Sequence, residues 1–119
     1  MSTGQPLKIL FICGRNQRRS PTAEKIFRND PRLTVRSAGT AESSRRRIGE
    51  PDLLWADNIL VMERKYEARI KSLFPGFHSL PPIILLDIPD EYTFMDPELI
   101  DLLTGSVESF LSEKDEQVN

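Results

Sequence analysis

The sequence has few of the cysteines and histidines from which disulfides and metal sites are built, and it lacks the long apolar runs that span membranes. It has one cysteine and one histidine among 119 residues, which excludes an intrachain disulfide and a multi-cysteine metal site. No apolar run is long enough to cross a bilayer, and the N-terminus has no signal-peptide pattern. The formal net charge of −2 gives no overall attraction to nucleic acid. We therefore expect no membrane and no nucleic acid partner, and no metal or organic cofactor is implied.

What the sequence does contain is an alternation of short apolar runs with helical patterns, which is typical of a parallel sheet covered on both faces. Strands are expected at 7–12, 33–37, 58–62 and 83–87. Helices are expected at 21–29, through Trp55, at 64–74 and from Pro97 to Leu111. This order predicts an α/β fold, a three-layer α/β/α sandwich with a four-stranded parallel sheet. We expect one domain over residues 1–119, with its core at about 7–111 and a polar tail at 112–119.

The most informative segment directly follows the first expected strand. It reads Cys13-Gly14-Arg15-Asn16-Gln17-Arg18-Arg19-Ser20, and Pro21 then opens a helix. A strand that passes through a tight loop into a helix directs backbone N–H groups and the positive end of the helix dipole at one spot. The segment therefore predicts a phosphate-binding loop. Its substrate-contacting residues are expected to be Gly14, Arg15, Asn16, Gln17, Arg18 and Ser20.

The single cysteine lies on the rim of this expected anion site. A thiol with a pKa of about 8.5 is mostly protonated at neutral pH, but N–H groups and a nearby arginine favour the thiolate, which is the nucleophile. Arg19 is expected beneath the anion, where its planar fork binds two phosphoryl oxygens. Ser20 is expected to cap the helix and to donate to the thiolate as it leaves. A working thiolate suits a reducing cytoplasm. A buried structural cysteine is the simpler alternative.

The segment from Cys13 to Glu24 resembles the signature of the low-molecular-weight protein tyrosine phosphatases. Three later segments resemble further parts of that family in the expected order. These are Ser37-Ala38-Gly39-Thr40, then 56–63, and Ile88-Pro89-Asp90-Glu91-Tyr92, which resembles the acid loop. The chain also differs from typical members. Arg18 replaces a second cysteine that many of them carry, and the stretch from Ser37 to Ala56 is shorter.

The resemblance implies a role for several further residues. Asp90 would be the general acid, although Asp87 lies close enough in sequence to compete for that role, whereas Asp96 before Pro97 resembles a helix cap. Ser37 would brace the loop, and Asn16 would adopt an unusual backbone conformation. Tyr92 is expected either to line the substrate pocket or to lie half-buried in the core.

The predicted function is a cysteine-dependent phosphomonoester hydrolase that forms a phosphocysteine on Cys13, most simply a protein tyrosine phosphatase. Its partner would be a phosphorylated protein or a small phosphomonoester. The alternatives are an arsenate reductase that uses an external thiol, a phosphocarrier, and a phosphate-binding module without catalysis. The run Arg45-Arg46-Arg47 is either a solvated face or a guide for anionic substrates.

Overall fold

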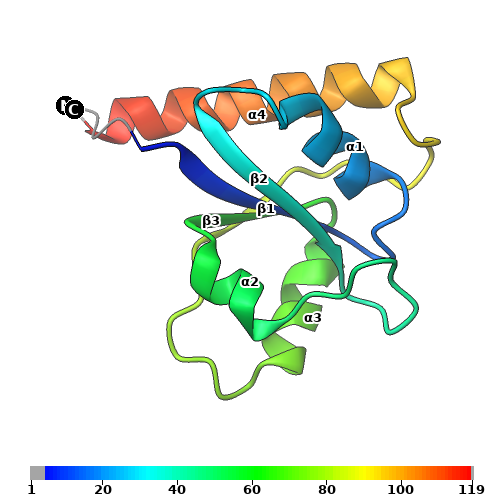
Figure 1. Ribbon diagram of the computed structural model, residues 1–119, viewed down its shortest axis with the longest axis vertical. Coiled ribbons are helices and arrows are strands. Elements are labelled where there is room, and N and C mark those ends of the chain that lie inside the picture. Colours follow the sequence, from blue (N-terminus) through cyan, green and yellow to red (C-terminus); the bar gives the residue numbers. More distant parts are fainter. Residues whose placement is uncertain (1–4, 119) are drawn as a thin grey trace.

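The computed structural model describes residues 5–118 and has the α/β architecture that the sequence predicts (Figure 1). Strands and helices alternate along the whole chain. In order they are β1 Leu7–Cys13, α1 Arg19–Phe27, β2 Leu33–Gly39, α2 Glu50–Trp55, β3 Asn58–Val61, α3 Arg64–Leu73, β4 Ile83–Leu85 and α4 Pro97–Val118.

The four strands form one parallel sheet in the order β2-β1-β3-β4. Figure 1 shows α1 and α4 on one face of this sheet and α2 and α3 on the other, so the predicted three-layer arrangement is confirmed. Because β1 lies between β2 and β3, the connections on its two sides leave toward opposite faces. In open α/β sheets a reversal of this kind creates a crevice at the carboxyl ends of the strands. The end of β1 is where Cys13 lies.

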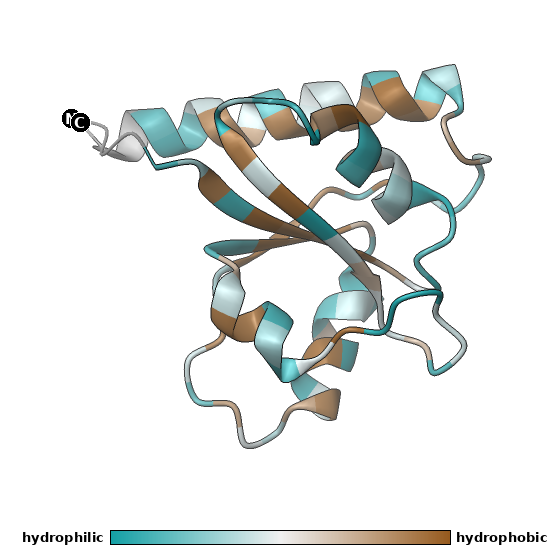
Figure 2. Cartoon of the chain, in the orientation of Figure 1, coloured by the Kyte–Doolittle hydropathy of each residue, from teal (hydrophilic) through white to brown (hydrophobic). Residues whose placement is uncertain are grey.

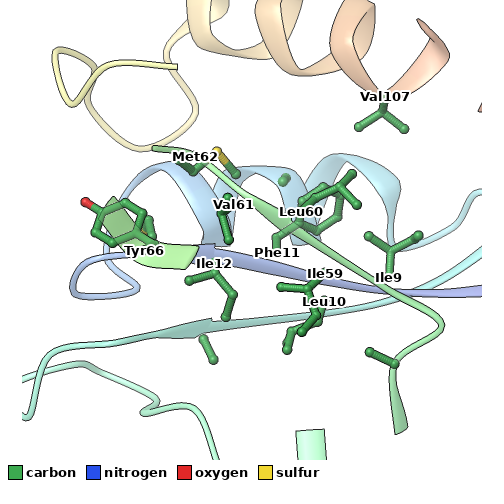
Figure 3. Close-up of a cluster of buried hydrophobic side chains, with 14 of the residues drawn as sticks. Ile9, Leu10, Phe11, Ile12, Ile59, Leu60, Val61, Met62, Tyr66 and Val107 are labelled. Atoms are coloured by element: carbon green, nitrogen blue, oxygen red, sulfur yellow. The ribbon is translucent and has the colours of Figure 1, made fainter. Parts of the chain in front are cut away.

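The core is built from the two central strands. Residues 9–12 of β1 and 59–61 of β3 have no exposed surface, which accounts for their uninterrupted apolar sequences. Figure 2 shows hydrophobic residues along the strands and hydrophilic ones on the outer sides of the helices. In Figure 3, Val107 of α4 faces this cluster from one side, and Tyr66 of α3 lies at its end with its hydroxyl directed away from the apolar side chains.

Several expected boundaries are wrong, most of them by one or two residues. The first helix begins at Arg19 rather than Pro21, because the backbone N–H of Thr22 already bonds the carbonyl of Arg18 at 3.0 Å. The last helix continues to Val118 instead of giving way to a tail at Ser112. Its final residues include no proline or glycine, so nothing in the sequence breaks the helix there. No helix within residues 5–118 is both long enough and apolar enough to span a bilayer.

Candidate active site

The carbonyl groups of the loop after β1 point toward residues 40–45, which follow the end of β2. The carbonyls of Cys13 and Gly14 accept hydrogen bonds from the backbone N–H groups of Thr40 and Ala41, at 3.2 and 2.9 Å. The next two carbonyls, those of Arg15 and Asn16, accept from the backbone N–H and the side-chain Nε of Arg45, at 3.0 and 3.1 Å. The backbone N–H groups of residues 15–18 have no acceptor within residues 5–118. Successive N–H groups left free in a turn at a helix start form an anion-binding concavity.

Gly39 permits this close contact between the loop and the end of β2. A Cβ atom placed on Gly39 would lie 2.7 Å from the carbonyl oxygen of Gly14 and 2.9 Å from the carbonyl carbon of Arg15. Both neighbours are backbone atoms of the loop, so they cannot yield without changing its shape. The glycine in the segment 37–40 is therefore required by packing.

Asn16 fixes the loop from within. It is completely buried and has a φ of 56°, so the expected unusual backbone conformation is confirmed. Its Nδ2 donates at 2.9 Å both to the hydroxyl of Ser20 and to the hydroxyl of Ser37. The Ser37 hydroxyl in turn donates to Glu24 at 2.5 Å. Ser37 thus lies where a residue that braces the loop is expected.

The hydroxyl of Ser20 lies 2.9 Å from the sulfur of Cys13. Since Asn16 already donates to this hydroxyl, the single proton of Ser20 is left to point at the sulfur. A donor in this position stabilises a thiolate over a thiol. Ser20 is the second residue of α1 and not its N-cap, which corrects one of the two roles expected for it. Its hydroxyl is used in the loop and is unavailable to the helix end.

The side chain of Arg19 is almost fully buried, with 2% of its surface exposed. Its Nη1 donates to Glu63 and to the carbonyl of Ile88, both at 2.6 Å, and its Nη2 donates to the Tyr66 hydroxyl at 2.9 Å. These bonds use three of the five N–H hydrogens of the guanidinium. The Nε–H and one Nη2–H remain, and they lie on the same edge. That edge has the two-pronged shape with which an arginine can bind two oxygens of one anion.

Charge and burial together favour a charged Arg19, a charged Glu63 and a protonated Tyr66. Burial opposes the charge of Arg19, but the hydrogen bond that Arg19 donates to Glu63 and the nearby acidic groups outweigh it and raise the pKa of the guanidinium. Burial would raise the pKa of Glu63, yet Arg19 lowers it below the ordinary value. Burial raises the pKa of Tyr66, so its hydroxyl stays protonated and donates to Glu63 at 3.2 Å.

Sequence reasoning missed Glu63 and Tyr66 as partners of Arg19. Glu63 was noticed only within the segment 56–63, and the position of Tyr66 in the apolar pattern of its helix indicates only a core residue. One signal was available. A buried arginine requires a carboxylate, and Glu63 follows β3, the neighbour of β1 whose carboxyl end lies at the same edge of the sheet.

A cavity of about 680 Å³ opens above the loop. Its lining includes most of the expected site residues. It is lined by Cys13, Gly14, Arg15, Gln17, Arg18, Arg19, Thr40, Ala41, Lys65, Tyr66, Arg69 and Asp90. Within residues 5–118 no cluster of histidine, cysteine and acidic side chains is placed to bind a metal ion.

The three candidate acids lie in different settings. Asp90 lines the cavity, and its Oδ1 is 3.7 Å from the Nε of Arg19. Asp87 is outside the lining and has a φ of 60°. Asp96 precedes α4, and its Oδ1 accepts the backbone N–H of Glu98 at 2.9 Å, as expected of a helix cap. Geometry therefore favours Asp90 as the acid.

Several expectations about substrate contacts need correction. Asn16 and Ser20, expected to contact the substrate, are fully buried and absent from the cavity lining, because their side chains bond within the loop. Tyr92 is not among the residues that line the cavity, because its hydroxyl donates to Glu98 at 3.1 Å on the first turn of α4. The arginine run does not form the cavity wall either. Arg45 bonds the loop carbonyl of Asn16, and Arg46 bonds the carbonyl of Ser37 at 2.8 Å and the carboxylate of Asp52. Arg45 and Arg46 thus hold the loop and its support in place.

Comparison with known proteins identifies a related family model and similar folds. Residues 8–54 match the model of the family described as low molecular weight phosphotyrosine protein phosphatase. No curated protein sequence matches the chain significantly.

Among solved structures, YfkJ from Bacillus subtilis has a TM-score of 0.70 at 21% identity and covers 99% of this chain and 100% of its own. The YwlE arginine phosphatase from Geobacillus stearothermophilus has a TM-score of 0.69 at 24% identity, with coverages of 93% and 97%. SP-PTP, a low-molecular-weight protein tyrosine phosphatase from Streptococcus pyogenes, has a TM-score of 0.73 at 19% identity, with coverages of 90% and 92%. The resemblance of this chain to the low-molecular-weight protein tyrosine phosphatases is therefore confirmed, in sequence over residues 8–54 and in fold over nearly its whole length.

Proposed function

We propose that the protein is a cysteine-dependent phosphomonoester hydrolase of the tyrosine phosphatase type, which works through a phosphocysteine on Cys13. One observation carries the proposal. The sulfur of Cys13, the free edge of Arg19 and the carboxylate of Asp90 all adjoin one cavity at the end of β1. A nucleophile, an anion clamp and a proton donor are the groups that phosphoryl transfer to a side chain requires.

In the first step the thiolate of Cys13 attacks the phosphorus of the substrate. The S–P bond forms as the bond from phosphorus to the ester oxygen breaks, and the departing oxygen takes a proton from Asp90. The loop N–H groups and Arg19 hold the three equatorial oxygens, over which the charge is spread in the transition state. Because Glu63 and Tyr66 fix the guanidinium before substrate arrives, little reorganisation accompanies the reaction.

In the second step water attacks the phosphorus of the phosphocysteine. Asp90, now a carboxylate, accepts a proton from that water, and the S–P bond breaks to release inorganic phosphate and the thiolate. The Ser20 hydroxyl, 2.9 Å from the sulfur, stabilises the thiolate as it leaves. Atoms and charges balance without a cofactor or an added thiol.

Three features bear on the rival functions. Arsenate reduction by a thiol relay needs further cysteines, and the sequence has one. A phosphocarrier should exclude activated water, whereas Asp90 is exposed in the cavity, with 58% of its side-chain surface accessible. A phosphoarginine substrate would bring its own guanidinium group into a cavity already lined by arginine and lysine. Repulsion between these cations therefore favours a phosphate ester as the substrate.

The test is the release of inorganic phosphate from phenyl phosphate in the absence of any added thiol or acceptor, combined with a rapid acid quench. We expect turnover and a trapped phosphoryl group on the peptide that contains Cys13. A carrier would become phosphorylated without releasing phosphate, and a reductase would respond only to arsenate with a thiol. A protein that binds phosphate but never forms the phosphopeptide would be a binding module.

Tyr66→Phe should lower kcat/KM for phenyl phosphate about tenfold, because one hydrogen bond that orients a charged group is lost. The inhibition constant of inorganic phosphate should rise in parallel, while the thermal unfolding midpoint changes little. The parallel change distinguishes a positioning role from a purely structural one. Steady-state kinetics with phosphate inhibition measures both quantities.

Tyr92→Phe is the matched control, because it removes the same atom from a tyrosine whose hydroxyl contacts Glu98 outside the cavity. It should leave both constants at their wild-type values. Equal losses in the two variants, or none in Tyr66→Phe, would show that the Tyr66 hydroxyl does not orient Arg19.

A further inference from the structure

Positive charge is concentrated at the cavity in a chain whose overall charge is negative. Besides Arg19, four cationic side chains line the cavity. Arg15 and Arg18 come from the loop, and Lys65 and Arg69 come from α3. Within residues 5–118, Asp90 is the only acidic side chain in the lining, whereas the whole chain has a formal net charge of −2.

Most of these cations are not neutralised by the protein. Within the described residues the side chains of Arg15, Arg18 and Arg69 make no hydrogen bond or ion pair. Lys65 has only a 3.9 Å approach to Glu63, a carboxylate already bonded to Arg19 at 2.6 Å, and a contact with the Tyr66 ring. Cations grouped in a concave site raise its potential and concentrate anions there.

Some cations outside the cavity are paired with carboxylates. Arg46 pairs with Asp52, and Lys71, two residues beyond Arg69 on the same helix, pairs with Glu67 at 3.1 Å. Lys65 and Arg69 are four residues apart, so they lie on one face of α3 and act on the same region of the cavity. Arg28, Arg47 and Arg64, outside the cavity, likewise make no side-chain hydrogen bond or ion pair within the described residues, so the cavity is distinguished by the grouping of such cations at one concave site.

A single phosphoryl group does not account for this much charge. Its oxygens are matched by the free edge of Arg19 and the N–H groups of the loop. A water molecule in the liquid takes about 30 Å³, so a cavity of 680 Å³ has room for much more than one phosphoryl group. The remaining cations favour further negative charge on the ligand, and the cavity has room for it.

We propose that the site selects phosphomonoesters that carry a second anionic group, phosphoryl or carboxylate, near the scissile phosphoryl group. Arg18, Lys65 and Arg69 bind that second anion, while Arg19 and the loop bind the first. The inference rests on the proposed phosphatase function and names the substrate class of that site. The second anion can belong to the same small molecule or to a residue next to a phosphotyrosine.

The test compares two matched substrate pairs at low salt. One pair is hydroquinone monophosphate and hydroquinone bisphosphate, and the other is a phosphotyrosine peptide flanked by alanines and the same peptide flanked by glutamates. We expect kcat/KM to be about tenfold higher for the more anionic member of at least one pair. The pair that shows the preference identifies the source of the second anion. The preference should shrink in 0.5 M salt, where screening is stronger (a Debye length of about 3 Å at 1 M).

In the double variant Lys65→Gln, Arg69→Gln the preference should fall to within about twofold of unity. Lys71→Gln is the matched control, since it removes a charge from α3 outside the cavity and should keep the wild-type preference. The thermal unfolding midpoint should be the same in the wild type, the double variant and Lys71→Gln. The inference is overturned if both pairs show ratios near one in the wild type, or if the double variant keeps the preference.

A binding experiment separates failure of this inference from failure of the proposed function. Cys13→Ser protein is titrated calorimetrically with inorganic phosphate and with pyrophosphate, which requires no turnover. Tighter binding of pyrophosphate, weakened by Lys65→Gln and Arg69→Gln, would support selection for a second anion even if no substrate were hydrolysed. Equal binding of the two ions by a protein that hydrolyses phenyl phosphate would refute the inference and leave the hydrolase intact.

Discussion

Cys13→Ser should abolish phosphate release, by about a thousandfold or more, while phosphate binding stays close to that of the wild type. Loss of a nucleophile removes the covalent route altogether, and a serine hydroxyl is not ionised by the setting that favours a thiolate. The anion site itself is made of backbone N–H groups and Arg19, none of which the substitution touches.

Steady-state release from phenyl phosphate and calorimetric titration with phosphate measure the two parts of this result. Arg19→Lys provides the contrasting variant. A single ammonium point charge cannot replace a planar fork that is already bonded to Glu63 and Tyr66, so this variant should lose both turnover and phosphate binding. A Cys13→Ser protein that keeps half of the wild-type rate would end the phosphocysteine mechanism.

Asp90→Asn should slow the hydrolysis of phenyl phosphate by about 10²–10⁴-fold, the range that general acids contribute. The effect should be much smaller for a nitrophenyl phosphate, because an acidic leaving group departs without a proton.

Asp87→Asn is the matched comparison, because Asp87 lies three residues earlier in the same connection but outside the cavity lining. It should leave the leaving-group dependence unchanged. Asp96→Asn should have only a small effect on stability, below about 1 kcal/mol, because asparagine also caps helices. If Asp87→Asn shows the leaving-group dependence and Asp90→Asn does not, the acid is Asp87.

The sequence is sufficient to predict the fold because its strands and helices leave different local patterns. β3 is a short run of buried residues that lies between the polar residues Asp57 and Glu63. The start of α4 is marked by Asp96, which caps the helix, and by Pro97, which opens it. The end of α4 was placed too early, because polarity alone was taken as the end of the helix. Local composition indicates solvent exposure there, and it does not report whether the backbone stays helical.

The anion loop was predictable for a similar reason, since Cys13, Asn16, Arg19 and Ser20 are close in sequence. The partners of Arg19 were not. Glu63 and Tyr66 reach it across 44 and 47 residues of chain, and their pairing depends on how α3 packs against β3, the neighbour of β1 in the sheet. Of the two placements expected for Tyr92, the half-buried one against the core is confirmed, and its hydroxyl donates to Glu98. Local sequence alone does not tell whether such a side chain faces the cavity or the core.

The hydrogen bonds between the loop and residues 40–45 affect the free energy of anion binding. Fixing one residue of backbone costs about 1–2 kcal/mol of conformational entropy. The carbonyls of Cys13 to Asn16 are already bonded by residues 40–45, so this ordering takes place when the chain folds and not when an anion arrives. Binding of a phosphoryl group therefore avoids this entropic cost and retains more of its favourable free energy, and residues that never touch the substrate contribute to its affinity.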